Sequence, residues 1–151
     1  MNNLITSEED SPEGWLLYGV KWSFKNHSNP ANTSELIQAI AHNHKDMGRD
    51  DMTEILMGES PFSKIDIAYE FFEPLNGHAG SAFRMATNDE QKLTYGQILM
   101  AIHMELSKAL EDKDTDRIYF KGLSPLPNPL EEGVPAYLVE VGSQSGVAAM
   151  Q

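Results

Sequence analysis

The chain has 151 residues, of which 40% are hydrophobic and 9% aromatic, so it is long and apolar enough to bury the core of one domain. Because it contains no cysteine, disulfides, thiolate metal sites and cysteine nucleophiles are excluded. Its 23 acidic residues outnumber its 11 lysines and arginines, and the net charge of -12 argues against binding to nucleic-acid backbones or anionic membranes and favours a basic partner.

The two ends of the chain differ in character from its middle. Residues 1–14 are polar and acidic and indicate a flexible N-terminal tail, and residues 143–151 are small and indicate a C-terminal tail. Residues 15–142 are expected to form a single domain. The first residues lack the basic and apolar regions of a signal peptide, and no apolar run is long enough to cross a bilayer, so we expect a cytoplasmic protein.

The first predicted elements are a strand and two helices. Every second residue from 16 to 24 is apolar, which indicates a half-buried strand over residues 16–25; these residues are Leu16, Tyr18, Val20, Trp22 and Phe24. Asn32 is a suitable N-cap for a helix that has Glu35 in its first turn and ends before Gly48. A second, short helix is expected over residues 51–57.

A hairpin and a long helix are predicted next. Residues 63–73 alternate like a strand, and residues 81–87 return as its antiparallel partner after a wide turn. The long helix covers residues 93–110, where Thr94 and Gln97 form a capping box. One stripe of this helix is apolar and requires a sheet to cover it; it contains Tyr95, Ile98, Leu99, Ile102, Leu106, Ala109 and Leu110.

Two further strands complete the predicted fold, at residues 117–123 and 136–141, separated by a proline-rich loop that cannot be regular structure. The element order β-α-(α)-β-β-α-β-β predicts an α+β fold. We expect a mostly antiparallel sheet of about five strands, with the two longer helices packed on one face.

Candidate metal sites in the sequence are weak. His42 and His44 form an H-x-H pair, but on a helix the two rings diverge, and His44 continues an apolar stripe as a half-buried core residue. Asp112, Asp114 and Asp116 have the spacing of the first ligands in an EF-hand loop, but Arg117 and Leu123 stand where that loop needs glycine and glutamate. No nucleotide-binding motif is present. We expect no cofactor.

Two surfaces are candidates for binding a partner. Met100 and Met104 lie opposite the apolar stripe of the long helix, where either this chain or a partner covers them, and we favour cover by this chain. The proline-rich loop, residues 124–135, carries Leu126, Leu130, Glu131 and Glu132 and suits either docking or an internal brace.

These features together predict a non-enzymatic acidic protein that inhibits or neutralises a basic protein partner, such as a toxin or nuclease. The profile resembles in general character that of bacterial immunity proteins and some phage inhibitors. Negative charge would steer the partner, and occlusion of its cationic site would inhibit it. The expected contacts are Asp112, Asp114, Asp116, Glu131 and Glu132 with the apolar residues named above. The alternatives are a metal-dependent hydrolase with histidine and carboxylate ligands, and an acidic secretion chaperone that dimerises and presents an apolar groove.

Overall fold

The structure is a computed structural model that describes residues 13–25, 29–73, 77–87, 91–111 and 118–142, with the backbone alone for 71–73 and 77–80. The expected tails fall largely outside these ranges. The helices are α1 (Thr33–Asp46), α2 (Thr53–Met57) and α3 (Tyr95–Ala109). The strands are β1 (Lys64–Glu73), β2 (Gly77–Ala86), β3 (Tyr119–Pro125) and β4 (Ala136–Gly142).

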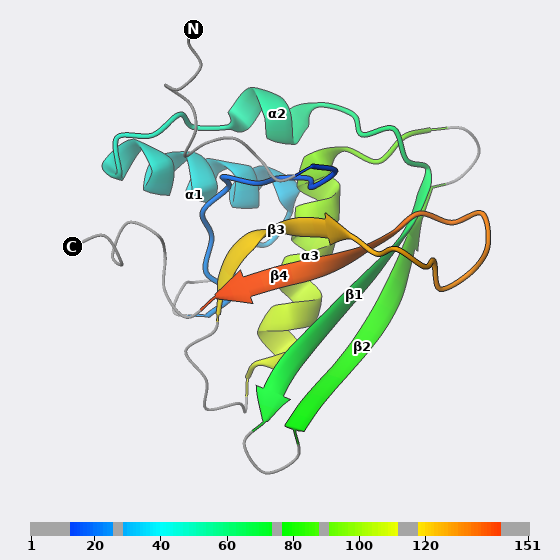
Figure 1. The fold of residues 1–151 in the computed structure, drawn as a ribbon. Coiled ribbons are helices and arrows are strands. Elements are labelled where there is room, and N and C mark those ends of the chain that lie inside the picture. The colour runs from blue at the N-terminus through cyan, green and yellow to red at the C-terminus, as the bar shows by residue number, and fades with distance from the viewer. Residues whose placement is uncertain (1–12, 26–28, 74–76, 88–90, 112–117, 143–151) are drawn as a thin grey trace, which may run out of the picture.

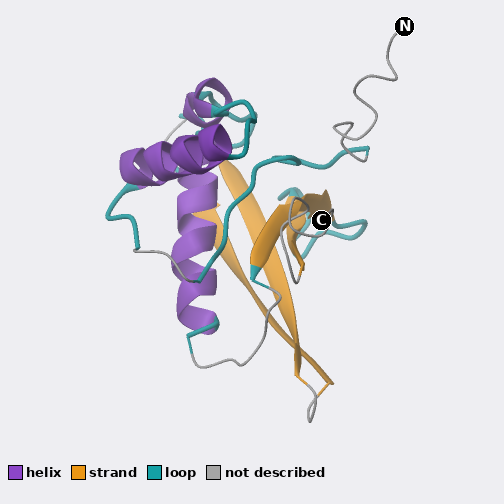
Figure 2. Ribbon diagram, turned by 90° about the vertical axis from the view of Figure 1, so that its left-hand side faces the viewer, coloured by secondary structure: helices purple, strands orange, loops and turns teal. Residues whose placement is uncertain are grey.

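The helices cover one face of a single sheet, which confirms the predicted α+β class (Figures 1 and 2). The strand order is β2-β1-β4-β3. The outer pairs, β1 with β2 and β3 with β4, are antiparallel, but the central pair, β1 with β4, is parallel. Within the described residues the sheet thus has four strands and is mixed, where about five mostly antiparallel strands were expected.

The prediction of a first strand over residues 16–25 is wrong, because these residues do not form a regular strand. The N-terminal segment (residues 13–25) runs beside β3 but forms only isolated bridges, Leu16 with Leu123 and Ser23 with Tyr119. Positive backbone angles, φ 59° at Leu17 and 98° at Gly19, turn the chain between these bridges and break the ladder. The apolar alternation still has its expected effect at the end of the segment, because Val20, Trp22 and Phe24 are buried.

The caps of the two longer helices are as predicted. The Asn32 side chain accepts a hydrogen bond from the Glu35 N–H at 2.9 Å and begins α1. In α3, Thr94 Oγ1 accepts from the Gln97 N–H at 3.1 Å, and Gln97 Oε1 accepts from the Thr94 N–H at 2.8 Å. These reciprocal bonds satisfy amide donors that a helix N-terminus leaves unpaired. The predicted short helix is also present, as α2.

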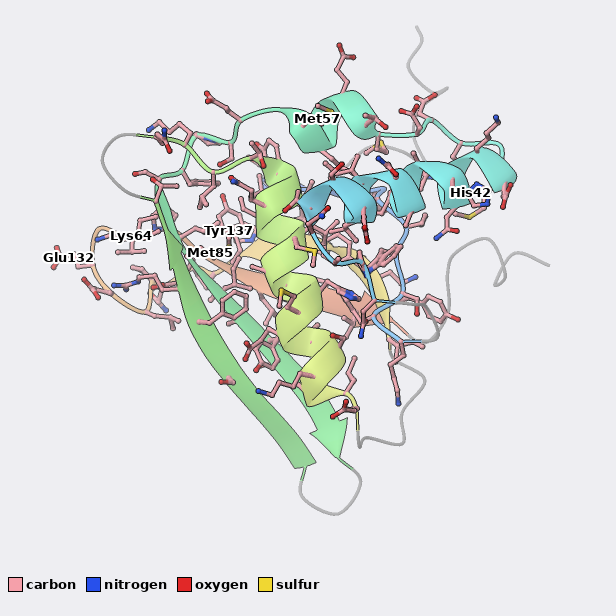
Figure 3. All side chains as sticks on the ribbon, turned by 180° about the vertical axis from the view of Figure 1, so that it is seen from behind. His42, Met57, Lys64, Met85, Glu132 and Tyr137 are labelled. Carbon is pink, nitrogen blue, oxygen red and sulfur yellow. The ribbon has the colours of Figure 1, made fainter. Side chains whose placement is uncertain are left out.

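Helix α3 is the centre of the core. Most of its predicted stripe is buried: Ile98, Leu99, Ile102, Leu106 and Leu110 have no exposed surface, and Tyr95 and Ala109 are partly buried. Gly96, Met100 and His103 are buried as well: Gly96 lies against Ile37 of α1 and Leu56 of α2, and the rings of Trp22 and Phe24 pack on His103. On the sheet side, Met85 and Tyr137 pack against the same core (Figure 3). Helix α3 is therefore covered on more of its circumference than the stripe alone predicts.

Candidate functional site

The proline-rich loop is tied to the sheet by an ion-pair network. Arg84 on β2 donates to both carboxylate oxygens of Asp66 on β1, at 2.7 and 3.0 Å, and to Glu131 Oε1 at 2.8 Å. Asp66 is only 4% exposed, and its hydrogen bonds with Arg84 hold the pKa of its carboxyl below its ordinary value. Glu131 was predicted to contact a partner, but its bond with Arg84 holds the proline-rich loop against the sheet.

The other predicted contacts of the loop are mixed in exposure. Leu126 is half-buried and its N–H donates to the Ala136 carbonyl at 3.0 Å, whereas Leu130 is 56% exposed and Glu132 is exposed. None of these three residues lines either of the two pockets found in the described part of the structure. Asp112, Asp114 and Asp116, the remaining predicted contacts, lie outside the described residues.

The two methionines of α3 have different environments. Met100 is buried in the core, in agreement with the expectation that other parts of this chain cover it. The face beside it is covered by the N-terminal segment, whose Trp22 and Phe24 rings pack on His103, one turn further along α3. Met104 is 61% exposed, so the prediction that this chain covers both methionines is wrong for Met104. The two side chains therefore do not form a joint surface.

The histidine pair diverges, as the helical periodicity predicts. His42 is exposed on α1, where its Nε2 lies 3.4 Å from Asp46 (Figure 3). His44 is 1% exposed, and both of its ring nitrogens are engaged by the protein backbone. In the described part of the chain, no group of three or more histidine, aspartate or glutamate side chains is placed to hold a metal ion.

A groove lies between the three helices, with a volume of about 470 Å³. Its lining is Thr33, Ser34, Ile37, Gln38 and Ala41 of α1, Thr53 and Met57 of α2, and Thr94 and Gln97. Met57, which lines the groove, is 64% exposed, and Figure 3 shows Met57 beside the start of α3. Ile55, two residues earlier on α2, is 51% exposed and points to another side of the helix. Four exposed acids flank this helix: Asp50, Asp51, Glu54 and Glu59. The groove, the two apolar side chains and these acids are called the α2 surface below.

A second cavity, of about 700 Å³, is lined by basic residues. It is formed by the N-terminal segment, the loop after α1 and β3; its lining is Tyr18, Gly19, Lys21, His44, Met47, Gly48, Arg49, Asp50, Met52 and Lys121. Three of the chain's 11 lysines and arginines line this cavity, called the basic pocket below.

Neither surface was predicted from the sequence. The three cations of the basic pocket, Lys21, Arg49 and Lys121, are far apart in the chain and share no motif. For the α2 surface the sequence did contain a signal. A short helix cannot bury all of its apolar side chains, so Ile55 and Met57, close in sequence to three acids, indicated an exposed apolar and acidic surface.

Comparison with known protein families, with characterised proteins and with solved structures finds no match to this chain. Across the ranges that the structure describes, no helix combines the length and the apolar character needed to span a bilayer.

Proposed function

We propose that the protein is a non-enzymatic binding protein whose α2 surface docks a basic, amphipathic helix of a protein partner. The observation that carries the proposal is the exposure of Met57 in the lining of an apolar groove, on a short helix that also exposes Ile55 and that carries or adjoins the exposed acids Asp50, Asp51, Glu54 and Glu59. Large apolar side chains that gather at one place on a surface mark interaction sites more often than scattered ones do.

The chemistry of the groove favours a helix as occupant. A groove of about 470 Å³ between α1, α2 and α3 has room for a few apolar side chains that a helix presents one turn apart. The flanking carboxylates complement lysines or arginines on the polar side of such a helix. A methionine at the edge, Met57, adapts to the shape of the side chain that it meets.

Charge would act before contact. With a net charge of -12, the protein attracts a basic partner over roughly the Debye length of 10 Å, and the acids around α2 orient it. If the docked helix carries the cationic site of a toxin or nuclease, docking occludes that site. Inhibition of a basic partner, as expected from the composition, is thus the proposed consequence of binding at α2.

The test is a pull-down from native lysate with the intact protein and with the double variant Ile55→Ser, Met57→Ser. We expect capture of a basic protein that the double variant loses at least tenfold, because two apolar contacts at about 1 kcal/mol or more each are removed. Leu130→Ser is the matched control, since Leu130 is 56% exposed on the proline-rich loop, away from α2. Equal loss with the control, or full capture by the double variant, would contradict the proposal.

The groove also favours a second candidate, an acidic secretion chaperone that binds an extended client segment. Such a protein is expected to dimerise and to hold its client along an apolar groove. Light scattering of the purified protein separates the two candidates. A dimer that keeps the α2 surface accessible supports the chaperone, and a monomer supports the docking of a single basic partner.

A further inference from the structure

The basic pocket concentrates positive charge in a strongly acidic protein. Lys21 comes from the N-terminal segment, Arg49 from the loop after α1, and Lys121 from β3, so three separate parts of the chain bring a cation to one cavity. Burial lowers the pKa of Lys21, and the neighbouring charges of Arg49 and Lys121 lower it further. Like charges that line one cavity repel one another, and an anion bound in the cavity would reduce that repulsion.

A polar atom of the pocket is buried without a partner. Within the described residues, Arg49 Nε is the side-chain nitrogen or oxygen that is inaccessible to solvent and makes no hydrogen bond. An unsatisfied donor of a charged group is costly to bury. Because Arg49 Nε has no surface open to solvent, a ligand in the cavity would contact other atoms of Arg49, the residue that lines the pocket. Among the described residues that line the pocket, Asp50 is the one acid; it is exposed, and its backbone carbonyl accepts a hydrogen bond from His44.

The walls of the pocket are held in place before any ligand arrives. The Lys21 N–H donates to His44 Nε2 at 2.9 Å, His44 Nδ1 donates to the Asp50 carbonyl at 2.7 Å, and the Arg49 N–H donates to the His44 carbonyl at 2.8 Å. His44 thus joins the N-terminal segment to the loop that carries Arg49. Preorganised walls lower the entropy that a ligand must lose on binding.

We propose that the basic pocket binds a small molecule that carries a phosphate group. A phosphate has two negative charges and several acceptor oxygens, which match one guanidinium fork and two ammonium groups. A cavity of about 700 Å³ is larger than a phosphate requires, and Tyr18, Met47 and Met52 supply apolar surface for an organic part. The Tyr18 ring packs edge-on against Trp15, with centroids 5.8 Å apart, and is partly exposed to stack on a ligand.

The first experiment is calorimetric titration of the whole protein with inorganic phosphate, pyrophosphate, adenosine monophosphate and, as a reference anion, sulfate, all at constant ionic strength. We expect saturable binding that is tightest for adenosine monophosphate if the organic part contacts Tyr18, and tightest for pyrophosphate if charge alone decides. Either order supports a phosphate site. Sulfate binding as tightly as phosphate, or no saturable binding of any of the four, would overturn it.

The second experiment uses Arg49→Met and Lys21→Gln, with Lys64→Gln as a control that removes the same charge from an exposed position on β1 (Figure 3). Loss of one charged contact is expected to weaken phosphate binding about tenfold or more, and the control is expected to stay within about twofold. Equal weakening by all three would mean that only net charge matters and would overturn the site.

Thermal unfolding distinguishes a ligand site from a structural cluster. Because Arg49 Nε makes no hydrogen bond, Arg49→Met is expected to keep or raise the Tm of the protein without ligand, while reducing the rise in Tm that phosphate gives the original chain. A lower Tm without ligand, together with an unchanged rise on adding phosphate, would overturn the proposal.

Discussion

His44 is neutral because of how its two nitrogens are used. Nε2 accepts the Lys21 N–H, so Nδ1 must carry the proton that it shares with the Asp50 carbonyl, and a second proton would displace the Lys21 bond. Burial lowers the pKa of this imidazole below its ordinary value of 6.5; the backbone hydrogen bond opposes that effect, and Arg49 and Lys21 add to it. His44 is thus a brace that depends on pH.

The pH dependence of stability follows from that shift. Unfolded His44 takes up a proton near pH 6.5 and folded His44 does so only at lower pH, so the free energy of unfolding falls as pH drops from about 6.5 to the folded pKa. We expect Tm to decline between about pH 7.5 and pH 5, measured by differential scanning calorimetry. The variant His44→Gln, compared with the exposed control His42→Gln, is expected to show a shallower decline; equal slopes in both variants would contradict this role.

Asp66 depends on a single arginine for its charge. Arg84→Gln leaves a buried carboxylate without its bidentate partner, and we expect Tm to fall by several degrees, in the range of about 3 to 6 °C. Glu131→Gln, which removes only the exposed end of the network, is expected to change Tm by about 1 °C or less. Thermal unfolding at neutral pH checks both. Similar losses in the two variants would show that the loop brace, rather than burial of Asp66, carries the effect.

Close packing between helices depends on one glycine. A Cβ at Gly96 would lie 2.9 Å from Ile37 Cδ1 and 2.9 Å from the Leu56 carbonyl oxygen, so α1 and α2 approach α3 where it has no side chain. We expect Gly96→Ala to destabilise the protein by about 1 to 3 kcal/mol despite the higher helix propensity of alanine. Urea denaturation measures this change in the free energy of unfolding. Lys108→Ala on the exposed side of α3 is the control, and a stability gain in Gly96→Ala would refute the close contact.

The elements that were predicted correctly carry their own local signals. The caps at Asn32 and Thr94 and the stripe of α3 are specified within a few residues, so the sequence alone predicts both helices. The N-terminal segment was predicted wrongly because its turn lies at Leu17, a residue type that gives no sign of a positive φ; Gly19 was the available warning.

Features that join distant residues were not predictable in this way. The parallel pairing of β1 with β4 and the convergence of Lys21, Arg49 and Lys121 depend on the tertiary arrangement, and no local pattern encodes either. The proline-rich loop was recognised as a loop, although its first two residues, Ser124 and Pro125, belong to β3. Its role as a brace depends on Arg84, which lies on another strand. Of the candidate sites, sequence patterns therefore identified side chains of the right character but not the surfaces that they form.

At the scale of the whole molecule, charge governs how a partner arrives. With a net charge of -12, the association rate with the proposed basic partner is expected to fall about tenfold between roughly 50 and 500 mM salt, while the dissociation rate changes little. Stopped-flow or surface-based kinetics with the captured partner measures both rates. If salt changed mainly the dissociation rate, charged contacts would hold the complex together, and the apolar contacts at Ile55 and Met57 would not be its main source of affinity.

The middle of the sheet is closed by the last of the described strands. β4 lies between β1 and β3, and its register with β1 joins Asp66 to Ala136 across the intervening hairpin and helix. A nascent chain that has not yet added Ala136–Gly142 can form the β1–β2 hairpin, but it has no strand to connect that hairpin with β3. During synthesis the edge of β1 that pairs with β4 therefore keeps its backbone N–H and C=O groups unpaired until the ribosome has delivered β4.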